Sequence, residues 1–203
     1  MSKPGSARQR LLSAAAECFY AHGVAATGID TITATAGVAK MSLYNNFASK
    51  DELVLAYLQE RHAEWLALYE ARLATSDGTG RAGVAAVFDA YADHANAAYV
   101  HGFRGCGLLN AAAELASGAA GRDQVRRHKE QVQQLLAGHL TNVNSLPADQ
   151  VEDLALQLSF ALEGAMSRAG LEGRSDLMVR AKALALQLVD QATTADATPQ
   201  ATA

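Results

Sequence analysis

The sequence has few of the residues that interrupt helices or build disulfide frameworks. Only three prolines occur among 203 residues, and none of them interrupts a long segment of helical periodicity. No stretch shows a convincing strand alternation, so the pattern predicts an all-α fold of about nine helices. The two cysteines, Cys18 and Cys106, lie far apart in the sequence. They indicate no disulfide framework, which fits a reduced, cytoplasmic compartment.

Long apolar runs and enzyme motifs are lacking as well. Although 50% of the residues are hydrophobic, no uninterrupted run of about 18 apolar residues predicts a membrane span. The first ten residues lack the apolar core of a secretory signal. No HExxH, GxSxG or Walker-type motif occurs, and the histidines at positions 94, 101, 128 and 139 lack zinc-like spacing. The sequence therefore predicts neither an enzyme nor a metal site, and no cofactor.

Charge is distributed unevenly along the chain. The formal net charge is −4, which by itself argues weakly against a nucleic-acid binder. Residues 1–53, however, carry five basic and four acidic side chains, so the acidic excess lies in the remainder. The positions of the basic residues matter more here than their number.

Residues 27–50 have the pattern of two short helices joined by a tight turn. We expect a first helix from Ser6 to His22, a second from Thr27, and a third over residues 39–47, with Gly37 in the turn between the last two. The pairs Ser6 and Gln9, Thr27 and Asp30, and Ser49 and Glu52 have capping-box spacing. A short polar helix that follows such a turn is typical of a helix-turn-helix, whose second helix enters the major groove of DNA.

Several side chains are predicted to contact DNA. Those expected to be exposed on the third helix are Lys40, Met41, Ser42, Tyr44, Asn45 and Asn46, and they suit base edges or phosphates. Phosphate contacts are expected from Lys50 and from the backbone N–H groups at Thr27 and Gly28. Arg8 and Arg10 are candidates for the DNA backbone or minor groove. The alternatives are that Tyr44 packs on the first helix and that the two asparagines lie on a solvated face.

The last two long helices, expected near residues 147–169 and 175–191, are apolar almost all round. Such helices must be buried almost all round. Because the chain is short, we expect a second copy to cover them, in a homodimer formed through the last two helices. The alternative is a monomeric core with alanine-rich outer faces.

The quoted residues also carry a family resemblance. The segment from Arg10 to Gly23, followed by Thr27, Ala36-Gly37-Val38, Leu43-Tyr44 and Ser49-Lys50, resembles the N-terminal domain of TetR/AcrR-family transcriptional regulators over residues 8–55. The resemblance implies an all-α homodimer with a three-helix helix-turn-helix domain and a helical ligand-binding and dimerisation domain. It also implies a repressor that binds palindromic operator DNA and is released by a small-molecule effector. By resemblance, residues 40–42 and 44–46 are recognition positions, and Thr27, Tyr44 and Lys50 anchor phosphates.

Three positions depart from the family pattern. Ala39 stands where a serine or threonine usually caps the recognition helix, and Met41 stands where glycine is common. Thr33 replaces a small alanine at the close contact between the second and third helices, where its hydroxyl group can bond back to its own helix, and we expect strain there but an intact turn. These departures bear on which operator sequence the protein prefers.

The remaining helices are expected to form the sensing domain. Residues 103–115 resemble a segment common in the same family. An apolar ligand cavity with a few polar groups is predicted from the following residues: Trp65, Tyr69, Phe88, Tyr91, Phe103, Cys106, Asn110, Phe160 and Glu163. The alternative for each is an ordinary core position. Cys106 has Arg104 as its only basic neighbour in the sequence, which suits a buried apolar thiol better than a redox sensor.

We expect residues 1–50 to form the DNA-binding domain, residues 51–192 the ligand-binding and dimerisation domain, and residues 193–203 a disordered tail. Two other functions remain open at this point. One is a helical protein-interaction adaptor that has kept the fold without DNA binding. The other is a transcriptional activator that uses the same helix-turn-helix.

Overall fold

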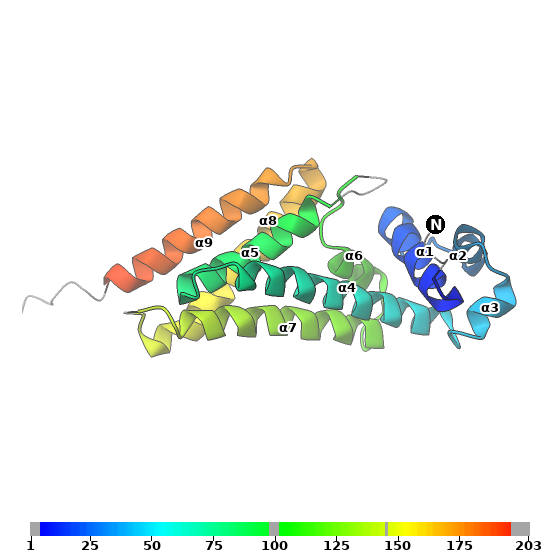
Figure 1. Cartoon of the computed structure of the whole chain (residues 1–203), viewed down its shortest axis with the longest axis horizontal. Helices are drawn as coiled ribbons and strands as arrows, with labels where there is room; N and C mark the ends of the chain where they lie inside the picture. The colour runs from blue at the N-terminus through cyan, green and yellow to red at the C-terminus, as the bar shows by residue number, and fades with distance from the viewer. Residues whose placement is uncertain (1–4, 98–101, 145, 196–203) are drawn as a thin grey trace, which may run out of the picture. The chain divides into compact units, whose positions relative to one another are not determined.

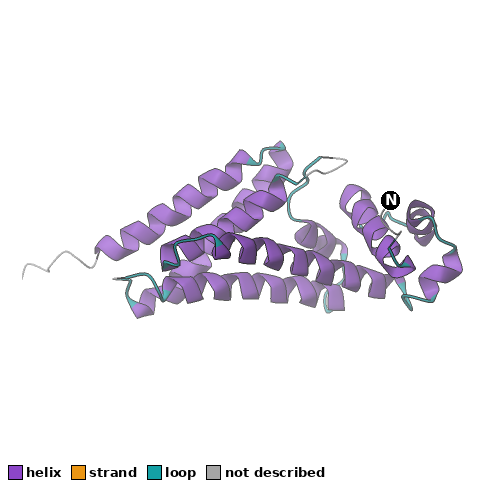
Figure 2. Cartoon of the chain, in the orientation of Figure 1, coloured by secondary structure: helices purple, strands orange, loops and turns teal. Residues whose placement is uncertain are grey.

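The computed structural model describes residues 5–97, 102–144 and 146–195 (Figure 1). In this part of the chain every regular element is a helix and no strand occurs (Figure 2). The all-α prediction is therefore confirmed. The α-helices are α1 (Ala7–His22), α2 (Ile29–Ala36), α3 (Lys40–Tyr44), α4 (Lys50–Ala74), α5 (Gly80–Ala95), α6 (Gly107–Glu114), α7 (Ala120–Leu140), α8 (Val151–Glu172) and α9 (Asp176–Ala195), and the 3₁₀-helix η1 covers Ala148–Gln150.

The ends of α1 follow the sequence signals. The Ser6 hydroxyl group accepts from the Gln9 N–H at 3.2 Å, and Oε1 of Gln9 accepts from the Ser6 N–H at 2.9 Å, so the predicted capping box is present. At the other end Gly23 has a φ of 89° and its N–H donates to the Phe19 carbonyl. Local sequence thus sets both limits of α1.

Two predicted boundaries in the helix-turn-helix were wrong. The second helix begins at Ile29 with Gly28 as N-cap, and Thr27 and Asp30 do not form a capping box. The Thr27 hydroxyl group instead donates to the carbonyl oxygens of Gly23 at 2.6 Å and Cys18 at 3.2 Å. Helix α3 ends at Tyr44 rather than at residue 47. Just after its end, the Asn46 side-chain amide donates to the Ser42 carbonyl at 2.7 Å.

The chain divides into two compact units. The first comprises Met1–Ala63 and Cys106–Arg127, and the second comprises Glu64–Gly105 and His128–Ala203. Within the first unit α1 packs against α2, α3 and α6, and within the second unit α9 packs against α5 and α8. The boundary at residue 50 between a DNA-binding and a ligand-binding domain remains a prediction.

The C-terminal helices differ slightly from expectation. Pro147 precedes the short η1 rather than starting the long helix, so α8 begins only at Val151. It ends at Glu172, and Gly173 with a φ of 63° caps it. Helix α9 continues to Ala195, so it includes the first residues of the predicted tail. The rest of that tail, residues 196–203, lies outside the described residues. Among the described helices, none combines the length and the apolar character needed to cross a membrane.

Candidate nucleic-acid interface

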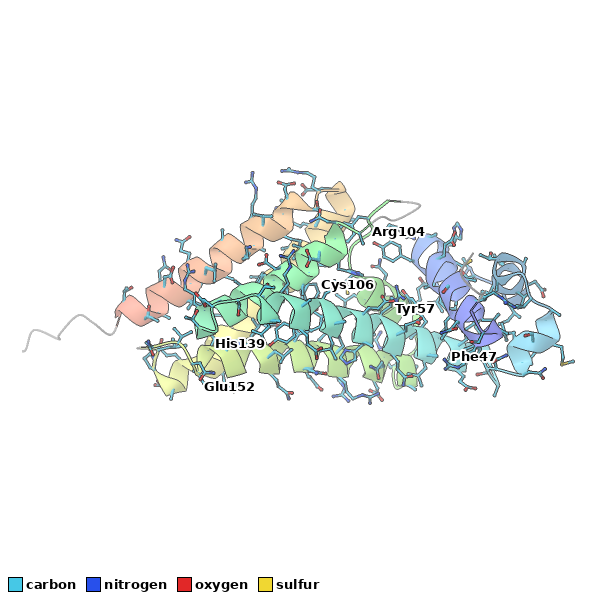
Figure 3. The ribbon with its side chains drawn as sticks, in the orientation of Figure 1. Phe47, Tyr57, Arg104, Cys106, His139 and Glu152 are labelled. Atoms are coloured by element: carbon cyan, nitrogen blue, oxygen red, sulfur yellow. The ribbon has the colours of Figure 1, made fainter. Side chains whose placement is uncertain are left out.

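A small apolar core holds α2 and α3 on α1. Leu11 of α1, Ile32 of α2 and Leu43 of α3 are all fully buried, and Phe47, just after α3, is 1% exposed (Figure 3). Burial of these side chains fixes the angle between the three helices, because each contributes about 1.5–3 kcal/mol when removed from water. Ile29 and Val38, at the edge of this core, are only half buried.

The turn between α2 and α3 has the predicted geometry. Gly37 adopts φ 62° and ψ 41°, the left-handed region that glycine reaches without strain. The Thr33 hydroxyl group donates to the carbonyl oxygens of Ile29 and Asp30, each at 3.1 Å, so the predicted back-bonding is confirmed. The N–H of Val38 then donates to the Thr33 carbonyl at 3.1 Å and starts the next segment. This turn presents the N-terminus of α3 to solvent.

Helix α3 exposes most of the side chains predicted to contact DNA. Met41 is 68% exposed and Tyr44 is 48% exposed, while Asn45 also lies on the surface. The exposure of Tyr44 argues against the alternative in which its ring packs on α1. A large apolar side chain that is as exposed as Met41 is shielded from water only when a ligand covers it. In the major groove, the thymine methyl group is the apolar group that such a side chain can contact.

Ser42 and Asn46 are half buried and bonded to one another through the main chain of Ser42. The Asn46 amide donates to the Ser42 carbonyl, so part of its hydrogen-bonding capacity closes the end of α3. The structure thus separates the predicted recognition residues into an exposed set, which includes Lys40, Met41, Tyr44 and Asn45, and a half-buried pair.

Lys40 at the start of α3 has a partner that the sequence did not suggest. Its Nζ lies 2.8 Å from Oδ1 of Asp30 at the start of α2, and the two side chains are 54% and 81% exposed. The hydrogen bond to the Asp30 carboxylate raises the pKa of Lys40 above its ordinary value. Asp30 had been expected to cap α2, and it instead joins the N-termini of the two helices.

Lys50, at the start of α4, is half buried and its Nζ donates to the Val24 main-chain carbonyl at 2.6 Å. An ammonium group has three donors, so this bond leaves capacity for a phosphate oxygen. Thr27 differs, because its side chain is only 2% exposed and its hydroxyl group points to main-chain carbonyls. A phosphate contact at Thr27 would therefore have to use the backbone.

Gly28, the N-cap of α2, is exposed, and no side chain caps the helix there. The backbone N–H groups at this exposed helix start therefore have no side-chain cap. Such groups favour an anion. The two arginines of the first helix are already engaged. The Arg8 guanidinium group lies 4.9 Å from the centre of the Phe47 ring, and Arg10 donates to the Gly5 carbonyl at 3.2 Å.

One residue that supports this surface was missed in the sequence. Oε2 of Glu114 at the end of α6 accepts from the Ala25 N–H at 2.7 Å and so holds the loop that leads into α2. A Cβ atom on Gly23 would lie 2.6 Å from the other oxygen of this carboxylate. Because 89 residues separate Glu114 from Ala25, no local pattern reveals the pair.

In the second unit, three of the predicted ligand-binding residues form one aromatic cluster. The Trp65 ring stacks on Tyr69 with centroids 5.7 Å apart and lies 5.2 Å from the Tyr91 ring. The His128 ring meets Trp65 edge-on at 5.2 Å, and its Nε2 lies 3.1 Å from the Tyr91 hydroxyl group. Lys129 reaches the same hydroxyl group at 3.3 Å.

The Lys129 ammonium group also pairs with Oε1 of Glu163 at 2.7 Å, which connects α8 to this cluster. Within the part of the chain that the structure describes, Oε2 of Glu163 and Nε1 of Trp65 are buried without a hydrogen-bond partner. The Tyr69 hydroxyl group lies 2.7 Å from Nε2 of His139, whose position on α7 is labelled in Figure 3. Burial lowers the pKa of His139 and raises that of Tyr69.

The other predicted ligand-binding residues lie elsewhere. Phe160 is 65% exposed on α8 and is therefore not brought into the buried aromatic cluster, whereas Phe88 is fully buried on α5. Phe103 is half buried, Asn110 is exposed, and Cys106 is buried at the N-cap of α6. No group of three or more potential metal-ligating side chains occurs among the described residues.

The geometry defines a class of protein: an all-α chain with a helix-turn-helix whose recognition helix is open to DNA. Comparison with known proteins agrees. The family model described as "Bacterial regulatory proteins, tetR family" matches residues 11–57. A TetR-family transcriptional regulator from Streptomyces coelicolor superposes with a TM-score of 0.77 at 30% identity, covering 90% of this chain and 95% of that one. The chain belongs to the TetR family of transcriptional regulators, which bind DNA and are not enzymes.

Two curated relatives come from Mycolicibacterium smegmatis. The transcriptional activator FasR is 43% identical over 96 residues, which cover 45% of this chain and 43% of FasR. The transcriptional repressor KstR2 is 38% identical over 65 residues, which cover 32% of this chain and 31% of KstR2. The chain thus matches less than half the length of either relative. Both share the helix-turn-helix class of regulator, although their names give opposite signs of regulation.

Proposed function

We propose that this regulator is a cytoplasmic homodimer that binds a palindromic operator, represses the adjacent gene and leaves the DNA when a small molecule binds its second unit. The observation that carries the proposal is the exposed face of α3, which begins with Lys40 and Met41 and ends with Tyr44, on a three-helix core. Residues at the N-terminus of a recognition helix are the ones that contact base edges in helix-turn-helix proteins.

The open face of α8 and α9 supports the dimer. Leu156, Phe160 and Leu171 on α8 are 37%, 65% and 85% exposed, and Val179 and Leu184 on α9 are 57% and 47% exposed. The two helices pack against each other. Large apolar side chains gathered on one such pair mark an association surface, and a symmetric dimer would cover the same face on both copies.

A dimer also sets the form of the operator. Two copies related by a two-fold axis present two recognition helices, and these read half-sites about one helical turn, or a multiple of it, apart. The operator is therefore a palindrome.

The buried aromatic cluster supports an effector site. Trp65 contributes an indole N–H and Glu163 a carboxylate oxygen, and both atoms are buried without a partner in the described residues. Buried polar groups in native proteins nearly always have partners, so each of these atoms is a candidate contact for a bound ligand. A hydroxyl or amide group on a ligand both accepts and donates, and it has the chemistry to pair with either atom.

The sign of regulation has two candidates. Repression is the sign that the family resemblance implies, and KstR2 is a repressor. FasR, which is 43% identical over its matched segment, is an activator. Transcription in vitro from the promoter beside the operator, with and without the protein, distinguishes the two: repression lowers the transcript yield and activation raises it.

A mobility-shift assay with the DNA upstream of the gene tests the proposal. We expect a shifted complex at low salt whose affinity falls when Lys40→Ala removes a charge from α3. Arg127→Ala on α7 removes a charge from an exposed position outside the helix-turn-helix and should leave the affinity nearly unchanged. Absence of any shift at low salt would favour the protein-interaction adaptor instead.

A further inference from the structure

The ion pair between Asp30 and Lys40 joins two elements at their exposed ends. The carboxylate stands near the start of α2 and the ammonium group at the start of α3, with Oδ1 and Nζ 2.8 Å apart. Both side chains are more than half exposed. An ion pair this open to water contributes little to folding stability, so folding stability alone does not explain why Asp30 is paired with Lys40 of the recognition helix.

A carboxylate at a DNA-binding surface is repelled by phosphates and by most base edges. In the major groove only the amino groups of cytosine and adenine donate hydrogen bonds, and Asp and Glu contact the N4 amino group of cytosine. Asp30 lies within hydrogen-bond reach of Lys40, the first residue of α3. If Lys40 contacts base edges in the major groove, the Asp30 carboxylate therefore lies close enough to contact them too.

The pair places a hydrogen-bond donor directly beside an acceptor. The major-groove edge of a C·G base pair has the complementary order, with the guanine N7 and O6 acceptors beside the cytosine N4 donor. Lysine donates well to the two guanine atoms together. A T·A pair does not offer the lysine two adjacent acceptors. It also places the thymine O4 acceptor where the C·G pair has the cytosine N4 donor, and a carboxylate oxygen of Asp30 would repel that O4 atom.

We propose that Asp30 is a specificity-determining residue, and that the Asp30–Lys40 pair reads one C·G base pair in each half-site, Asp30 accepting from cytosine N4 and Lys40 donating to guanine O6 and N7. This inference rests on the proposed function, because it requires that α3 enters the major groove. It assigns to Asp30 a contact that neither a cap nor a surface ion pair would make.

Selection of binding sites from random duplex DNA by the full-length protein gives the first test. We expect one position per half-site at which C·G is preferred over T·A by about tenfold, the size of a single good base contact. In Asp30→Ala that preference should fall to about twofold or less, while binding to unrelated DNA at low salt becomes tighter because a negative charge is gone. The matched control is Thr31→Ala, an exposed neighbour on α2, which should keep the wild-type preference.

A base analogue that lacks one functional group gives the second test. Replacing the cytosine of that base pair with 2-pyrimidinone removes only its exocyclic amino group. The loss of affinity should be several-fold larger for the wild type than for Asp30→Ala, because only the wild type uses that amino group.

The outcomes separate this inference from the proposed function. Sequence-selective binding whose preferences are unchanged in Asp30→Ala, or a preference for A·T at the affected position, would overturn the assignment of Asp30 alone. A wild-type protein that selects no sequence would overturn the proposed function, and this inference with it.

Discussion

The Nζ atom of Lys50 donates to the main-chain carbonyl of Val24 at 2.6 Å, and this bond joins the start of α4 to the loop between α1 and α2. The same side chain is the predicted phosphate anchor. Its position is therefore fixed before DNA arrives, and a preorganised charge loses less conformational entropy on binding.

Replacing Lys50 with alanine should weaken DNA binding by a similar factor on every sequence. A phosphate contact carries no base information, and its loss should reduce the slope of log affinity against log salt concentration by about one. Titrations at several salt concentrations, on the operator and on unrelated DNA, measure both effects. Lys50→Arg keeps the charge and should retain most of the slope. A loss confined to one base position would mean that Lys50 reads a base instead.

Thr27 should act through folding stability, because its buried hydroxyl group donates to two carbonyl oxygens. Thr27→Val keeps the shape but leaves both carbonyl oxygens without this donor, at an expected cost of about 1–3 kcal/mol. Thr27→Ser should cost clearly less. Urea unfolding followed by circular dichroism measures the difference. Equal stability of the valine variant and the wild type would show that these bonds contribute nothing.

Two helical glycines should respond to alanine with opposite signs. A Cβ on Gly83 in α5 would clash with the His139 ring of α7, so in Gly83→Ala the ring or the helices must shift, which should destabilise the protein by about 1–3 kcal/mol. A Cβ on Gly138 in α7 meets nothing within 4 Å, so Gly138→Ala should stabilise by about 0.5–1 kcal/mol. Thermal unfolding of the two variants side by side tests the packing. If both changes acted in the same direction, the close approach of α5 and His139 would be refuted.

Acidification should destabilise the second unit through His139. Burial lowers the pKa of His139, so the folded chain binds a proton less readily than the unfolded chain does. The stability that the neutral ring contributes is complete above the unfolded pKa of about 6.5 and is lost as pH falls from there toward the lower folded pKa. His139→Gln has no proton to gain, so its Tm should fall less than that of the wild type between about pH 7.5 and about pH 5.5.

His62 serves as the comparison for the pH experiment. Burial lowers the pKa of His62 too, so His62→Gln should flatten the same pH profile independently. The two effects should add, because the histidines lie on different helices, α4 and α7, and belong to different compact units. A pH profile that neither variant changes would contradict the role of burial at both positions.

The sequence predicted those features that local rules control. Ser6 with Gln9, Gly23 and Gly37 all have the predicted roles, because a cap or a left-handed turn depends on residues within one turn of helix. The family resemblance was equally local and pointed to the same helix-turn-helix that the family model matches at residues 11–57. The exposed side chains of α3 followed from the periodicity of a single helix.

Contacts between distant segments could not be predicted. The Thr27 hydroxyl group donates to the carbonyl oxygens of Cys18 and Gly23 and does not cap α2. The Asp30 carboxylate pairs with Lys40 instead of capping the start of α2. Glu114 holds Ala25 from 89 residues away. Phe160 was predicted to line the ligand cavity, yet its side chain is exposed on α8, because the apolar surface of that helix exceeds what one chain covers. In each case tertiary contacts decided between options that were locally equivalent.

A single charged substitution on α8 tests whether the exposed apolar side chains of α8 and α9 form the dimer interface. Phe160→Glu places a carboxylate in the proposed dimer interface and should give a monomer at micromolar concentration in sedimentation velocity, with little change in helical content. Gln134→Glu adds the same charge at an exposed position on α7 and should leave the dimer intact. A wild-type protein that sediments as a monomer would refute the dimer directly.

The most direct test of the whole account is the number of chains bound to one operator. Native mass spectrometry of the protein with a palindromic duplex from its own upstream DNA should show two chains per duplex, and with Phe160→Glu the two-chain complex should be largely lost. One wild-type chain per palindrome, or no complex at low salt, would contradict a dimeric DNA-binding regulator.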